Sequence, residues 1–258
     1  MCTQWVQRKD KPNNNKHRVS IWAAVFCFCM AFAMTTTESS QKAAETDQTI
    51  ESQQSPTLQS PDQWTSLDGT SIKSGWSFDN DFISLSQLGP DQSELAGGHI
   101  ITKDEFEDFD LEFEWKIERN GNSGIKYMVQ RYSDRHLGLE YQIYDDDGTH
   151  RVEPENSTGA IYDLFAPTQD KPLKTAGQWN KSRIVVHDTR IQHWLNGKLI
   201  TTATMHNREW NDRVAASKFN DVPNFCKSRR GRLMLTDHGS NAWYRILSFK
   251  AGQISNDP

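Results

Sequence analysis

Glu140 and Gln142 stand two residues apart within residues 139–144, where a strand would direct both side chains to one face. Asp145 and Asp146 follow them directly. A carboxylate and an amide beside further carboxylates could bind a polar ligand and could give or take a proton during a reaction. Isolated polar residues on a β-sandwich are usually surface residues, so the group is better evidence of a site than any single member.

Further side chains that could do chemistry occur at other predicted strands and loops. The candidates are Lys126, His150, Tyr162, Trp194, Asp237 and His238. Sugars often bind on aromatic rings, although most of the nine tryptophans are expected to belong to the core. The sequence contains no nucleophile elbow, P-loop, zinc-type Cys/His spacing or dinucleotide fingerprint.

Three predicted strands must position these side chains. Apolar and charged residues alternate strictly over residues 109–118, which predicts a strand with one buried face and one wet face. Residues 123–129 predict a second strand, with Tyr127 and Val129 on the same face. Residues 139–144 predict the third, with Glu140 and Gln142 opposite its apolar residues.

The rest of the chain predicts many further short strands. Asn196-Gly197 is a strong hairpin signal between residues 190–195 and 198–200, and residues 209–218 form the one predicted helix. Turn signals recur every eight to twelve residues in this part of the chain. This pattern predicts an all-β fold, an antiparallel sandwich or jelly roll.

Composition excludes some classes of function. The net charge is −5, which disfavours a nucleic-acid partner held by its phosphates. Cys226 is the only cysteine beyond residue 30, so the folded part cannot contain an internal disulfide framework.

The N-terminal segment predicts export. Residues 1–18 are basic, residues 19–34 are apolar or small, and Ala31-Phe32-Ala33 resembles a cleavage site. We interpret residues 1–34 as a signal peptide, 35–61 as a flexible linker and 62–252 as the folded domain, which predicts a periplasmic or secreted protein. An uncleaved signal would leave the protein tethered to a membrane, but the apolar run is shorter than the roughly 20 residues that span a bilayer.

A set of short motifs occurs in order along residues 63–249. They are Asn122-Ser123-Gly124-Ile125-Lys126-Tyr127, Gly138-Leu139-Glu140-Tyr141-Gln142, Asp145-Asp146 with His150, Tyr162-Asp163, His193-Trp194-Leu195-Asn196-Gly197, Ser217-Lys218-Phe219 and Asp237-His238-Gly239. Together they resemble the 3-keto-disaccharide hydrolase family, also described as 3-keto-glucoside lyases and hydratases. The resemblance implies a concanavalin A-like jelly roll and a role in exported carbohydrate breakdown. Thr236 departs from the pattern, because family members often have Gln there.

The chemistry that the resemblance implies does not need the paired carboxylates of an ordinary glycosidase. A ketone at C3 of a glucoside makes the C2 proton acidic, the resulting enolate expels the C1 substituent, and water adds to the unsaturated product. Such a route needs a base near C2, a positive or hydrogen-bonding group at the C3 oxygen and an acid near the leaving oxygen.

As a hypothesis, five residues share the catalytic roles. His150 or His238 would act as base or acid. Glu140 and Asp145 would act as acid, base or metal ligands, and with a histidine they could hold a divalent cation. Lys126 would stabilise the enolate.

The expected partner is a carbohydrate, an oxidised glucoside or disaccharide. Gln142 and Tyr162 would orient its hydroxyl groups, and Asp237 and Trp194 would provide further contacts. Two alternatives remain open: a lectin-like module that binds a glycan without cleaving it, and a conventional hydrolase that acts on unoxidised sugar through an acid/base pair.

The signal-peptide interpretation predicts that the protein, expressed in its native type of host, leaves the cytoplasm without its first thirty-odd residues. Mass spectrometry of the intact product from each cell fraction measures this directly. A cytosolic product that retains residues 1–34 would contradict the interpretation.

Overall fold

The computed structural model describes residues 57–252 apart from 90, 92 and 96. These residues all belong to the second of two units into which the chain divides, residues 52–258. The predicted signal peptide and most of the predicted linker lie outside the described residues. Within the described part of the chain, no helix is both long and apolar enough to cross a membrane.

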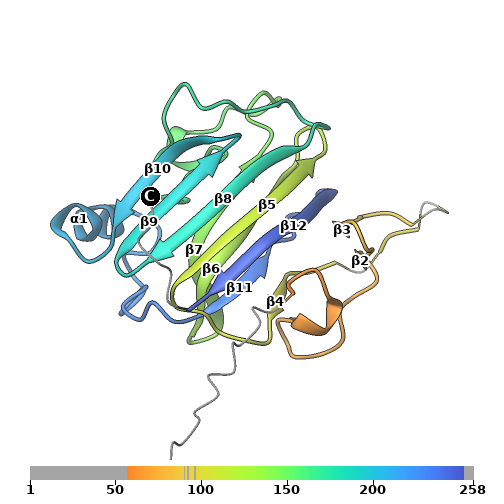
Figure 1. Ribbon diagram of the computed structural model, residues 1–258, viewed down its shortest axis with the longest axis horizontal. Helices are drawn as coiled ribbons and strands as arrows, with labels where there is room; N and C mark the ends of the chain where they lie inside the picture. Colours follow the sequence, from red (N-terminus) through yellow and green to blue (C-terminus); the bar gives the residue numbers. More distant parts are fainter. Residues whose placement is uncertain (1–56, 90, 92, 96, 253–258) are drawn as a thin grey trace, which may run out of the picture. The chain divides into compact units, whose positions relative to one another are not determined.

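Two antiparallel sheets form the domain, as the all-β jelly-roll prediction requires (Figure 1). In spatial order, the five-stranded sheet contains β1 (Trp64–Ser66), β4 (Ile100–Thr102), β11 (Arg232–Leu235), β6 (Asn122–Tyr132) and β7 (Arg135–Tyr144). The seven-stranded sheet contains β10 (Lys198–Thr204), β9 (Arg190–Leu195), β8 (Asn180–His187), β5 (Phe109–Ile117), β12 (Ala242–Ala251), β3 (Ile83–Leu85) and β2 (Trp76–Phe78). The described helices are α1 (Arg208–Ala216) and the 3₁₀ turns η1 (Pro61–Gln63) and η2 (Pro154–Asn156). The fold is a concanavalin A-like jelly-roll β-sandwich.

The core lies between the sheets and follows the two-residue period of the strands. Every apolar residue of β5 is buried and every charged residue between them is half-buried, as the alternation predicts. Phe113 of β5 meets Tyr141 of β7 edge to face, with ring centroids 5.6 Å apart. Since Tyr141 points into the core, its neighbours Glu140 and Gln142 point to the outer face of the five-stranded sheet.

One strand differs from its predicted alternation. The register of β6 against β7 shifts between Tyr127 and Gln130, and Met128 has a positive φ of 53°. This β-bulge puts Met128 in the main core and turns Val129 to a small cluster with Ile101. The prediction that Tyr127 and Val129 share one face is therefore wrong, because strict alternation cannot anticipate an extra residue in a strand.

The predicted hairpin and helix are both confirmed. Asn196 and Gly197 adopt positive φ values of 45° and 85° and join β9 to β10. The helix α1 begins after Asn207, whose side chain accepts a hydrogen bond from Trp210 N, 2.7 Å away.

His193 is buried completely between the sheets, and its ring is held by two polar partners. Its Nε2 lies 2.9 Å from the hydroxyl of Tyr127, and its Nδ1 lies 3.0 Å from the carbonyl oxygen of Gly159. A neutral ring that donates from Nδ1 and accepts at Nε2 satisfies both contacts. Burial lowers the pKa of His193 to about 4.

This buried histidine predicts acid sensitivity. An unfolded histidine has a pKa of about 6.5, so the stability that neutral His193 contributes is complete above that pH and is lost as the pH falls toward 4. The loss is on the order of 3 kcal/mol. In urea unfolding between pH 7.5 and 4.5, His193→Gln should lose less stability on acidification than wild type, while the exposed control His150→Gln should follow wild type. Parallel curves for wild type and His193→Gln would contradict this account.

Candidate active site

Glu140 is a buried carboxylate at the centre of a polar cluster on the outer face of the five-stranded sheet. Only 5% of the residue is exposed. Its Oε2 lies 3.7 Å from Lys126 Nζ on the neighbouring strand β6, and its Oε1 lies 3.9 Å from His238 Nε2. The hydroxyl of Thr236 is 3.4 Å from Oε1. Strand β7, strand β6 and the residues after β11 thus bring a carboxylate, an ammonium group and an imidazole together. None of these elements could form the cluster alone.

The charge state of Glu140 is set by two opposed effects. Burial alone would raise the pKa of its carboxyl, but His238, Lys126 and Lys218 outweigh burial and hold the pKa below its ordinary value. Glu140 is therefore ionised at neutral pH and can accept a proton.

Gly124 makes room for this carboxylate. A Cβ on Gly124 would lie 2.5 Å from Glu140 Oε1 and 3.0 Å from Glu140 Cγ. Gly124 pairs with Gln142 across the β6–β7 ladder, beside the pair of Lys126 and Glu140. Any larger residue there would push the carboxylate away from its cationic partners.

The segment of residues 159–165 crosses the edge of β7, contributes Tyr162 to the cluster and holds Lys218 beside it. Tyr162 N donates a hydrogen bond to the backbone oxygen of Glu140 at 3.0 Å. Lys218 Nζ lies 3.9 Å from the centre of the Tyr162 ring, and the side chain of Asp163 accepts from Lys218 N at 2.7 Å. Burial lowers the pKa of Lys218 and raises the pKa of Tyr162, so Tyr162 stays a phenol that can donate a hydrogen bond.

Gln142 lies next to Glu140 on the same face and is also buried. Its Nε2 donates to the side-chain oxygen of Asn122 at 3.3 Å. Asn122 N in turn donates to Ser240 Oγ at 3.1 Å. These contacts fix the amide beside the carboxylate, where it could bind a sugar hydroxyl.

His238 and Asp237 form the rim of the cluster, together with His99. The rings of His99 and His238 meet edge to face with centroids 5.7 Å apart. Asp237 N donates to His99 Nδ1 at 2.9 Å, and burial, followed by Lys126 and His238, lowers the pKa of His99 to about 4. His99 is therefore neutral at neutral pH, and its Nε2 carries the hydrogen.

Three predicted site residues lie away from this cluster. Asp145 is about five residues of strand from Glu140, roughly 16 Å, and its carboxylate accepts from Asn120 N at 2.8 Å, which holds the turn between β5 and β6. His150 is exposed in the following loop. Trp194 lies on the outer face of the seven-stranded sheet, because its neighbours His193 and Leu195 point into the core.

The geometry does not favour a divalent cation at Glu140. Among the described residues, no group of three or more His, Cys, Asp and Glu side chains is placed to hold a metal ion. Glu140 and Asp145 do not form one ligand set, and the charged groups nearest to Glu140 include the ammonium groups of Lys126 and Lys218, which repel a cation.

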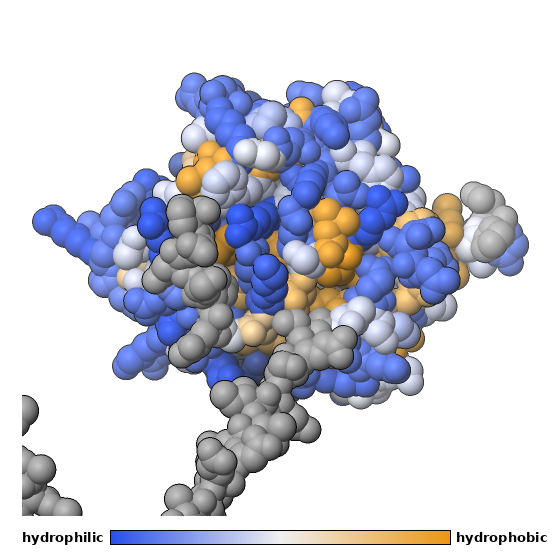
Figure 2. All heavy atoms as spheres, in the orientation of Figure 1, coloured by the Kyte–Doolittle hydropathy of each residue, from blue (hydrophilic) through white to orange (hydrophobic). Residues whose placement is uncertain are grey.

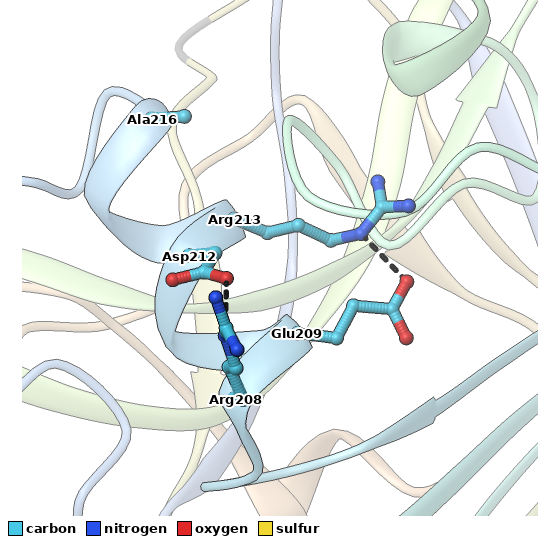
Figure 3. Close-up of a pocket in the computed structure, with 5 residues that line it drawn as sticks. All are labelled: Arg208, Glu209, Asp212, Arg213 and Ala216. Carbon is cyan, nitrogen blue, oxygen red and sulfur yellow. Dashed lines mark hydrogen bonds and ion pairs between the residues drawn. The ribbon is translucent and has the colours of Figure 1, made fainter.

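Another hollow, of about 590 Å³, lies against α1, and none of the residues that line it belongs to the Glu140 cluster. Its charged side chains pair with one another along the helix, Arg208 with Asp212 at 3.6 Å and Arg213 with Glu209 at 3.1 Å (Figure 3). The face of the molecule in Figure 2 is largely hydrophilic, with several apolar patches, one of them near its centre. Exposed helical ion pairs contribute little energy and leave few free groups for a ligand, so this hollow has the character of ordinary surface.

Sequence reasoning missed His99, Thr236 and Lys218 as members of the cluster. Lys218 belongs to a motif noted for its resemblance, but its spacing from Glu140 in the sequence gives no sign of contact. Each residue reaches the cluster from a loop or strand end whose position depends on the whole fold.

The comparisons with known proteins agree on a family and a fold. The family model for the 3-keto-alpha-glucoside-1,2-lyase-like domain matches residues 59–250. A 3-keto-disaccharide hydrolase from Bacteroides thetaiotaomicron is 26% identical over 214 residues, 72% of this chain and 73% of that protein. A solved structure from Parabacteroides distasonis, provisionally described as a glycosyl hydrolase, is 28% identical with a TM-score of 0.64, and the match covers 74% of this chain and 89% of that one. A second such structure from the same organism is 24% identical with a TM-score of 0.53, over 73% of this chain and 98% of that one, and shows the fold.

The space beside Gly124 gives a testable prediction. Gly124→Ala should lower the free energy of unfolding by about 1–3 kcal/mol and should displace the Glu140 carboxylate, which would shift the imidazole resonances of His238. Gly138→Ala is the matched control, because its Cβ would meet Tyr127 O at 2.5 Å on the same strand pair, away from the carboxylate. Urea unfolding and NMR of the histidine rings measure both effects. Unchanged stability and unchanged His238 resonances in Gly124→Ala would show that the carboxylate does not need this space.

Proposed function

The chain belongs to the 3-keto-alpha-glucoside-1,2-lyase-like domain family, and we propose that it cleaves the glycosidic bond of 3-keto-glucosides or 3-keto-disaccharides. The observation that carries this proposal is the buried, ionised Glu140 with Lys126, Lys218 and His238 around it. The name of the Bacteroides relative supports the same substrate class.

The proposed reaction proceeds by elimination and hydration. A base removes the C2 proton, and the electron pair of that C–H bond forms an enolate with the C3 carbonyl. The enolate expels the C1 substituent, whose oxygen keeps the electron pair of the C1–O bond and takes a proton from an acid. Water then adds to C1 and a proton returns to C2, so the net change is hydrolysis without oxidation or reduction.

Glu140 is the proposed base, because it is ionised and shielded from water. Lys126 and Lys218 are the proposed stabilisers of the enolate. Their positive charges face Glu140 before the reaction and would face the new negative charge on the C3 oxygen once Glu140 has taken the proton.

His238 is the proposed acid for the leaving oxygen. Its side chain is 36% exposed and lies at the rim, so it can exchange protons with solvent between turnovers. Gln142 and Tyr162 are the proposed hydrogen-bonding partners of the sugar hydroxyls, since both lie beside Glu140 with amide or phenol groups.

The carboxylates that adjoin the cluster argue against a conventional acid/base pair. Asp163 accepts a hydrogen bond from Lys218 N, and Asp237 accepts from Gly98 N at 2.6 Å and Gly239 N at 2.9 Å. Both therefore hold backbone in place. An ordinary retaining or inverting glycosidase needs two carboxyl groups free to act on the same bond.

Export is part of the proposal and rests on the sequence alone. The basic and apolar N-terminal segment would direct the domain to the periplasm or the medium. There it would meet carbohydrates before they enter the cell.

Replacement of Glu140 distinguishes the hypothesis of an enzyme from that of a lectin-like binding module. Glu140→Gln keeps the size of the side chain but removes the base, so turnover of a 3-keto-glucoside should fall about 10²–10⁴-fold while binding is largely retained. The control Glu112→Gln removes a half-exposed carboxylate of the seven-stranded sheet that pairs with Lys181 at 2.7 Å, and it should leave turnover unchanged. Melting temperatures verify that both variants are folded.

Turnover by wild type in D₂O should place deuterium at C2 of the released keto sugar. Wild-type protein that binds the keto sugar but never releases the C1 substituent would favour a lectin-like module. Equal turnover of the unoxidised glucoside would favour a conventional hydrolase.

A further inference from the structure

A pocket adjoins the Glu140 cluster and shares His99 and Asp237 with its rim. The pocket has a volume of about 300 Å³ and lies between the loop that follows β1, the residues before β4 and Asp237. His99 lines this pocket, and its ring also contacts the ring of His238 at the rim of the cluster. A ligand bound at Glu140 could therefore extend past the two histidines into this pocket.

The far wall of the pocket is fixed. Asp237 accepts hydrogen bonds from Gln87 Nε2 at 3.1 Å, Gly98 N at 2.6 Å and Gly239 N at 2.9 Å. A Cβ on Gly97 would lie 2.1 Å from Asp237 Oδ2, so only glycine permits this close approach. A wall held this way is preorganised and loses little conformational entropy when a ligand binds.

The open side of the pocket carries a negatively charged group, a positively charged group and an imidazole. Asp68 accepts hydrogen bonds at its Oδ1 from Thr70 N at 3.0 Å and from the Thr70 hydroxyl at 2.6 Å, and the residue is exposed. Lys73 supplies an exposed ammonium group. His99 adds a hydrogen-bond donor, because Asp237 N occupies its Nδ1.

We propose that this pocket is the subsite for the second sugar of a 3-keto-disaccharide, the ring that leaves when the C1–O bond breaks. Carboxylate, ammonium and imidazole groups suit the hydroxyls of a sugar better than an apolar aglycone. The volume lies at the lower end of the range for ligand pockets, about 300–1,000 Å³, and is large enough for a sugar ring. The subsite rests on the proposed function, and it specifies disaccharides over glucosides with apolar substituents.

Two substrates and two variants test the subsite. The double variant Asp68→Asn/Lys73→Ala removes its outer charged groups, and Lys103→Ala removes an exposed lysine outside the pocket as the control. For a 3-keto-disaccharide of two glucose units, kcat/KM should fall about tenfold to a hundredfold in the double variant, as expected for lost hydrogen bonds to charged groups. For methyl 3-keto-α-glucoside, which has no second ring, kcat/KM should change less than about twofold. An equal fall for both substrates, or no fall for the disaccharide, overturns the subsite.

A binding measurement distinguishes failure of the proposed subsite from failure of the proposed function. If wild type cleaves neither keto substrate, the proposed function fails, and saturation-transfer NMR with the unoxidised disaccharide then tests the pocket. Saturation transfer with wild type and Lys103→Ala but not with the double variant supports a sugar site there. No transfer with wild type, or equal transfer with the double variant, overturns it.

Discussion

The structure depends on the burial of one ionised carboxylate on a strand whose other face forms the core. Glu140 is 5% exposed, and its neighbour Tyr141 packs against Phe113 across the sandwich. An unpaired charge in that position would cost several kcal/mol. Lys126 on β6 and His238 after the end of β11 offset this cost, and Gly124 on β6 leaves the space that the carboxylate needs. Packing of the core thereby fixes where the Glu140 carboxylate lies and which way it points. Lys126 and Lys218 help to keep this carboxylate ionised.

The same strand is an edge of its sheet, and the cover over that edge also builds the site. Tyr141 bridges to Ile161, and Gly159 N donates to the backbone oxygen of Gln142 at 2.8 Å, so the open edge of β7 is partly paired. The covering segment then supplies Tyr162, and Asp163 within it holds Lys218. Because Gly159 O also accepts from buried His193, the core and the cover share a hydrogen-bond network. The segment that protects the edge strand β7 therefore also helps to assemble the Glu140 cluster.

The sequence predicts those features that depend on local pattern. Alternation in β5 and β7 is enough to place Phe113 inside and Glu140 outside, and Asn196-Gly197 is enough to predict its hairpin. The bulge at Met128 is not predictable, because alternation carries no information about an extra residue. Lys218 could not be placed beside Glu140 either, since loop positions depend on long-range packing. The sequence also could not distinguish Asp145, which holds a turn, from Glu140, which belongs to the polar cluster. Both are carboxylates within or directly after the same predicted strand.

The balance of charge around Glu140 bears on the proposed mechanism. Glu140 faces Lys126 and Lys218, with His238 beside it, while the adjoining carboxylates of Asp163 and Asp237 accept hydrogen bonds from backbone N–H groups. If Glu140 took a proton from C2 as proposed, both lysines would lose the negative charge that they face. A negative charge would then develop on the C3 oxygen of the proposed substrate, within the same cluster. The cations would therefore be better matched to the enolate than to the bound ketone, and only interactions that strengthen in this way lower the barrier to reaction.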